Sequence, residues 1–160
     1  MGHISTRDQG LAVGTTGPIL ETRTRILDSA PESISCAETE ALEMAGRGDF
    51  PQATVERIGL AVHEIMINAV VHGNGCSPIK KVVITLSRTP SKMKIIIADE
   101  GEGFDPDHLP DPLSPEGLLR SSGRGVYLAR AFMDEFSVER DAAGWTIVTM
   151  AKFIALPNAG

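Results

Sequence analysis

The segment "KMKIIIADEGEGF", residues 92–104, decides how the chain is interpreted. An apolar run rich in isoleucine ends at Asp99, and glycines follow at positions 101 and 103. β-Branched residues bounded by Asp and Gly predict a strand over 92–99 that leads into a turn. In one interpretation, Asp99 is an ordinary turn residue. In the other, its carboxylate is held at the end of the strand in order to bind something.

Length and composition predict one soluble, globular domain. The chain has 160 residues, of which 42% are hydrophobic and 22% are charged, so it can bury a substantial core. The formal net charge of −6 argues against direct nucleic-acid binding over a broad face. No apolar run approaches the roughly 18 residues that a membrane span requires. The N-terminus lacks the apolar core of a secretory signal, and two cysteines suit a reducing cytoplasm.

Periodicity and turn residues predict short elements with local connections. Residues 19–28 alternate as a strand does, Ser29 and Pro31 indicate a helix start, and residues 51–73 carry an apolar stripe with helical spacing. Hairpins and local helices favour an α/β fold, a two-layer sandwich of a mixed, mostly antiparallel sheet with helices on one face. The expected elements are a strand at 19–28, helices at about 31–46 and 51–73, strands at 81–87 and 92–99, a helix at 123–136, and strands at 137–141 and 145–154.

The predicted domain spans residues 19–156. Residues 1–18 are expected to form a flexible arm and residues 157–160 a tail. Within the domain, residues 104–122 are rich in proline and acidic residues. A connection of that length in a compact domain is usually functional or disordered, so we expect it to be a mobile lid.

The helix expected over 51–73 carries a carboxylate and a carboxamide, which form a candidate catalytic pair. Glu64 and Asn68 are four residues apart, so they project from the same side. They lie beside the apolar stripe, at the edge of the buried face. This pair is either a solvated polar edge without a role, or a base beside a metal ligand, because an Asn oxygen is a hard neutral donor that suits Mg²⁺.

If Asp99 binds a ligand, adenine fits its chemistry. An ionised carboxylate accepts a hydrogen bond from the exocyclic amine of adenine, whereas guanine has a carbonyl at that position that would repel it. Gly101 and Gly103 would then let a flat base approach the backbone, because they carry no Cβ.

The segment "SSGRGVY", residues 121–127, places Gly123 and Gly125 at the start of a helix. Unpaired backbone N–H groups and the helix dipole make such an end a binding site for anions. Arg120 and Arg124 are either ordinary solvated charges or cations that reach a terminal phosphate, and the sequence does not choose between them.

Three motifs together resemble a known superfamily. "HEIMINAVVHGN" resembles the N box of the ATPases shared by gyrase, heat-shock chaperones, histidine kinases and mismatch-repair proteins. "DEGEGF" resembles their first glycine box and "SSGRGVYLARAFMDE" the second. With its short length and the text between those boxes, the chain looks most like the bacterial anti-sigma-factor serine/threonine kinases, over roughly residues 19–155.

The resemblance implies a site that binds ATP and Mg²⁺. In it, Glu64 would be the catalytic base, Asn68 the Mg²⁺ ligand and Asp99 the adenine contact. Thr146 matches the threonine near adenine in the last box, although the usual Gly-Thr is Trp145-Thr146 here. The nucleotide-cradling glycines would be Gly101, Gly103, Gly123 and Gly125.

The resemblance also implies a function. The chain would be an ATP-dependent protein serine/threonine kinase in the cytoplasm, acting as an anti-sigma factor. It would bind a sigma factor, phosphorylate a serine or threonine of an anti-anti-sigma antagonist protein, and form a homodimer. Two alternatives remain: a nucleotide-sensing module that sequesters a partner without useful catalysis, and the detached ATP-binding domain of a histidine kinase.

Overall fold

The computed structural model describes residues 17–104 and 124–155. Most of the expected N-terminal arm, the C-terminal tail and nearly all of the lid therefore lie outside the described residues. The elements are β1 (Glu21–Asp28), α1 (Pro31–Gly46), α2 (Gln52–Ile67), η1 (Asn68–Gly73), β2 (Lys81–Arg88), β3 (Lys92–Asp99), α4 (Arg124–Phe132), β4 (Glu135–Arg140) and β5 (Thr146–Phe153).

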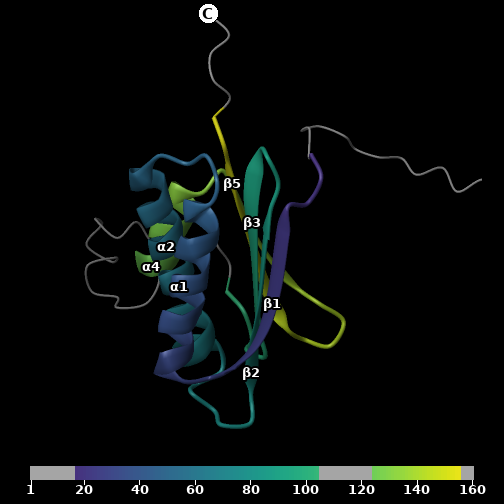
Figure 1. Cartoon of the computed structure of the whole chain (residues 1–160). Helices are drawn as coiled ribbons and strands as arrows, with labels where there is room; N and C mark the ends of the chain where they lie inside the picture. Colours follow the sequence, from purple (N-terminus) through teal and green to yellow (C-terminus); the bar gives the residue numbers. More distant parts are fainter. Residues whose placement is uncertain (1–16, 105–123, 156–160) are drawn as a thin grey trace, which may run out of the picture.

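Five strands form one sheet in the order β1-β2-β3-β5-β4. Every strand pair in the described part of the chain is antiparallel. The helices α1, α2 and α4 form a second layer on one face of the sheet (Figure 1). The expected fold class, a two-layer α/β sandwich with helices on one face, is confirmed.

The core lies between the two layers. Alternate residues of β2 and β3 are buried against the helices, as period-two patterning requires. The stripes expected on the helices are also buried, from Ile34 to Ala45 on α1 and from Val55 to Ala69 along α2 and η1. The two helices approach so closely that a Cβ on Gly59 would lie 2.5 Å from Cδ2 of Leu42.

The long helix differs from the expectation near its end. It is α-helical only to Ile67 and continues as a π-helix from Asn68 to Gly73. A π-helical turn is uncommon and occurs frequently at functional sites. The change begins at Asn68, the residue for which the sequence suggested a metal-binding role.

Two expected boundaries were wrong. The last helix ends at Phe132, not at residue 136, and β4 already begins at Glu135. The N–H of Asp134 donates to the carbonyl of Ala151, 2.9 Å away, so the chain has already joined the sheet there. Ser29 does not cap α1 either; its hydroxyl donates to the carbonyl of Lys80, 2.6 Å away.

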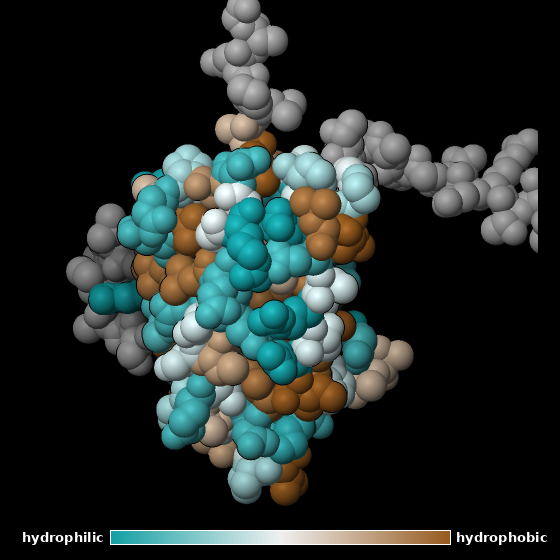
Figure 2. All heavy atoms as spheres, viewed as in Figure 1, coloured by the Kyte–Doolittle hydropathy of each residue, from teal (hydrophilic) through white to brown (hydrophobic). Residues whose placement is uncertain are grey.

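Hydrophobic residues on the surface are dispersed on the face shown in Figure 2, where they form separate groups among hydrophilic ones. The exposed large hydrophobic residues include Ile19, Leu20 and Ile26, at or just before β1. Among the described residues, no helix has the length and apolar character needed to span a bilayer.

Candidate functional site

Glu64 and Asn68 lie on consecutive turns of the continuous α2–η1 helix, both half-buried. Neither side chain makes a hydrogen bond or ion pair with another described residue. Buried polar groups are usually hydrogen-bonded to protein or to water, and partly exposed ones can be hydrogen-bonded to water alone. Two side chains without such partners are therefore available to a ligand.

The carboxylate of Glu64 lies against the start of α4. A Cβ on Gly125 would overlap Oε2 of Glu64 and would lie 3.0 Å from its Cβ. Glycine at this position thus leaves room for the carboxylate beside the first turn of α4. The structure brings together a candidate base and the helix start that the sequence predicted to bind anions.

Asp99 lies at the end of β3 and is almost completely buried, with 3% of its surface exposed. The N–H of Gly101 donates to its Oδ1, 2.7 Å away. Burial raises the pKa of Asp99, and the Gly101 hydrogen bond and the charge of Lys80 oppose that rise in part. No described residue donates a hydrogen bond to the other oxygen, Oδ2.

Glycines surround the Asp99 carboxylate closely. A Cβ on Gly73 would lie 2.5 Å from Oδ1 of Asp99, and a Cβ on Gly101 would lie 2.5 Å from Cα of Gly73. Neither position has space for a side chain. The C-terminal end of η1 is therefore packed directly against the turn after β3, and one continuous helix contacts both Gly125, through Glu64, and Asp99, through Gly73.

Thr146 completes this end of the sheet. It pairs with Asp99 across β3 and β5 and is 1% exposed. Its hydroxyl donates to the carbonyl of Gly101, 2.9 Å away. A Cβ on Gly103, where φ is +83°, would lie 3.0 Å from the Thr146 hydroxyl oxygen. Only glycine adopts such a backbone conformation readily, so this tight turn depends on Gly103.

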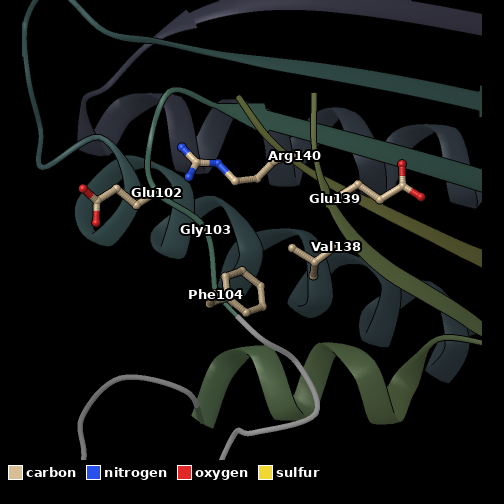
Figure 3. A pocket seen from close by; sticks show the side chains of 6 residues that line it. All are labelled: Glu102, Gly103, Phe104, Val138, Glu139 and Arg140. Atoms are coloured by element: carbon tan, nitrogen blue, oxygen red, sulfur yellow. The ribbon is translucent and has the colours of Figure 1, made fainter. Parts of the chain in front are cut away.

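An open depression lies beside Gly103, between the turn after β3 and the edge strand β4. Figure 3 shows Phe104 and Val138 facing the same space, with Arg140 extended along another side. The guanidinium of Arg140 is held by the carbonyl of Gly144, 3.0 Å from Nη2. The depression is therefore lined by apolar residues, by Arg140 and by two acidic residues, Glu102 and Glu139, and it adjoins the Gly101–Thr146 hydrogen bond.

The structure does not test every residue suggested by the sequence. Arg120 and Gly123 lie outside the described residues. Arg124 is the first residue of α4 and is exposed. Sequence reasoning missed Gly73 and Asn74, although the glycine that ends the "NAVVHG" helix could have indicated a close approach.

The described residues contain no group of three or more His, Cys, Asp or Glu side chains that could hold a metal. Mg²⁺ does not require such a group, because it commonly uses one or two protein oxygens together with phosphate oxygens and water. The carboxamide of Asn68 is chemically suited to that role.

A match to the histidine kinase-like ATPase domain family covers residues 27–152. The chain therefore belongs to this family, and the superfamily resemblance of its motifs is confirmed. Membership implies that the chain binds ATP.

The chain is also similar to proteins named serine-protein kinase RsbW. The relative from Oceanobacillus iheyensis is 28% identical, with 78% of this chain and 82% of that protein covered. The relative from Bacillus subtilis is 28% identical, with 78% and 80% covered. The relative from Staphylococcus epidermidis is 27% identical, with 80% and 84% covered. The fold also matches a solved structure of the mycobacterial sensor histidine kinase MprB. The match covers 82% of this chain and 97% of the MprB chain, with a TM-score of 0.49 and 15% identity.

Proposed function

We propose that this protein is an ATP-dependent protein serine/threonine kinase that acts as an anti-sigma factor. The observation that carries the proposal is that the α2–η1 helix contacts both parts of the candidate site, Asp99 through Gly73 and Gly125 through Glu64. Asp99 and Thr146 hold the turn after β3, while Glu64 lies against Gly125 at the start of α4. Similarity to the serine-protein kinases over most of the chain supports the same function.

Asp99 would select adenine. Its Oδ1 already accepts the N–H of Gly101, which leaves Oδ2 to accept the exocyclic amine of the base. Guanine has a carbonyl in place of that amine, so its nucleotides would meet a repulsive contact with an ionised carboxylate. The glycines at 101 and 103 would allow the base to lie close to the backbone.

The α2–η1 helix would supply the chemistry. Asn68 would hold Mg²⁺, which offsets phosphate charge when bound. Glu64 would accept the proton of a serine or threonine hydroxyl. That oxygen would form a bond to the γ-phosphorus as the bond from phosphorus to the bridging oxygen breaks, leaving ADP. Gly125 and the start of α4 would present backbone N–H groups to the phosphates.

The proposed partners follow from the kinase function and the resemblance. A sigma factor would be bound and kept from polymerase, and an anti-anti-sigma antagonist would be the phosphoacceptor. We propose a cytoplasmic homodimer. If partner binding is coupled to the bound nucleotide, ATP and ADP would favour different partners. Each partner would then change the affinity for the nucleotide by the same factor.

The test is transfer of labelled γ-phosphate to a candidate antagonist encoded beside this gene, together with capture of a candidate sigma factor. Label on a serine or threonine of the antagonist, with sigma binding, supports the proposal. Sigma binding without transfer would indicate instead a nucleotide-sensing module that sequesters its partner. Label on a histidine would indicate a histidine-kinase domain.

A further inference from the structure

Asn74 lies at the centre of a buried polar network that has no place in the proposed chemistry. It follows η1 directly and is 3% exposed. Its Nδ2 donates to Oγ of Ser29 and to the carbonyl of Lys81, each 2.9 Å away. Its Oδ1 accepts the N–H of Glu100, 2.8 Å away. One side chain thus joins the end of η1 to the segments that flank β1, β2 and β3.

Two further hydrogen bonds close the network. The hydroxyl of Ser29 donates to the carbonyl of Lys80, 2.6 Å away, and the N–H of Lys81 donates to Oε2 of Glu100, 2.8 Å away. The side chain of Asn74 therefore uses both of its N–H donors and its oxygen. A buried network in which each member is satisfied holds its parts rigidly.

The network fixes both sides of the Asp99 carboxylate. Asn74 is bonded to the N–H of Glu100, the residue after Asp99. It also directly follows Gly73, which packs against Oδ1 of Asp99 and against Gly101. Movement of Asn74 would shift Gly73 and the turn after β3 relative to each other. Hydrogen bonds weaken steeply when their angle degrades, so a small shift would misdirect the Asp99 carboxylate.

We propose that Asn74 is a positioning residue for nucleotide recognition, which acts by holding Asp99 in the pose that reads the exocyclic amine of adenine. This inference rests on the proposed role of Asp99. Asn74 itself touches no substrate; it acts through Glu100 and Gly73. A purely structural Asn74 would hold the fold together but would not influence which base is preferred.

Comparison of ATP with purine riboside 5′-triphosphate, which lacks the amine, separates these roles. The ratio of their dissociation constants measures the amine contact alone. Wild-type protein should bind ATP at least about tenfold more tightly than the analogue, the low end of the value of a hydrogen bond to a charged group. In Asn74→Ala the ratio should fall to about threefold or less, because ATP loses affinity and the analogue does not.

Two further variants keep the test decisive. Ser29→Ala removes one hydrogen-bond partner of Asn74 and should lower the ratio of dissociation constants by a smaller factor. This variant replaces Asn74→Ala in the test if Asn74→Ala does not fold. Gly59→Ala should destabilise the protein through overlap with Leu42. That packing contact is separate from the network, so the ratio should stay at its wild-type value.

The outcomes are distinct. A ratio that falls in the network variants and not in Gly59→Ala supports the inference. An unchanged ratio in folded Asn74→Ala and Ser29→Ala, or an equal loss of affinity for both nucleotides, overturns it. A ratio near one in the wild-type protein would instead remove Asp99 from amine recognition, and the inference about Asn74 would fall with it.

Discussion

The carboxylate of Glu64 and the backbone of Gly125 are in such close contact that no Cβ fits between them. The contact joins the last turn of α2 to the first turn of α4, and its two residues are 61 positions apart in the sequence. It fixes where a candidate base lies relative to a helix start that can bind phosphate. The geometry of transfer would therefore depend on a residue that has no side chain.

Gly125→Ala should lower phosphoryl transfer on the order of 10²-fold, the typical cost of displacing a reacting group by about 1 Å. The added methyl group would push the Glu64 carboxylate away from its position. The overall fold should persist, because Ala favours helices more than Gly does. Single-turnover transfer and circular dichroism measure the two effects.

Gly46→Ala is the matched control. A Cβ there would meet no atom within 4 Å, so the same substitution should leave transfer unchanged. Normal transfer by Gly125→Ala would show that the Glu64–Gly125 contact does not matter for the reaction.

Asp99→Asn should weaken Mg-ATP binding by about 2 kcal/mol, roughly 30-fold, the typical value of a hydrogen bond to a charged group. The substitution keeps the size of the side chain and can still accept the Gly101 N–H, but it removes the charge. Calorimetric titration gives the dissociation constant. Asp28→Asn is the control, because Asp28 also ends a strand but is exposed; equal affinity losses in the two variants would argue against a specific role for Asp99.

The same substitution should stabilise the protein when no nucleotide is bound. Burial raises the pKa of Asp99 in the folded state. The stability that its protonated form contributes is present below the unfolded pKa of about 3.9 and is lost as the pH rises through the folded pKa. At neutral pH the folded protein therefore carries a penalty that asparagine removes.

The free energy of unfolding, measured by urea denaturation at several pH values, provides the test. The advantage of Asp99→Asn over wild type should grow as the pH rises from about 4 toward neutrality. If Asp99→Asn is less stable than wild type at neutral pH, the ionised carboxylate stabilises the fold, which would contradict a raised pKa for Asp99.

Asn68→Ala should reduce the Mg²⁺-dependent part of ATP affinity. Loss of even an indirect partner of a metal ligand typically costs about 10–100-fold in metal affinity, so a direct ligand should cost at least about tenfold. The measurement is the ratio of ATP dissociation constants with EDTA and with Mg²⁺. Val71→Ala, exposed on the same π-helix, is the control, and an unchanged ratio in Asn68→Ala would exclude Asn68 as the ligand.

The periodic part of the fold could be predicted from the sequence, because the alternation in β3 and the stripe on α2 directly reflect burial. The boundary between α4 and β4 could not, since the hydrogen bond from Asp134 to Ala151 arises from the sheet and not from local preference. The π-helical end of the long helix was not predicted either, because local sequence preference does not indicate it.

The motif residues at the site could be identified from the sequence, but the residues that hold them in place could not. Asp99 stands out because a charge ends an apolar run. Asn74 does not stand out, because its partners Ser29 and Glu100 are 45 and 26 residues away along the chain. Its network depends on where β1, β2 and β3 end in space.

The central claim is tested most directly by the single-turnover rate of phosphoryl transfer from Mg-ATP to the antagonist protein, with wild-type protein, Glu64→Gln and Glu56→Gln measured together. Glu56 is an exposed carboxylate two turns earlier on α2. The account predicts transfer to a serine or threonine by wild type and Glu56→Gln, and a rate about 10²–10⁴-fold lower for Glu64→Gln with ATP affinity retained. Wild-type transfer rates in Glu64→Gln, or no transfer by any of the three proteins, would contradict it.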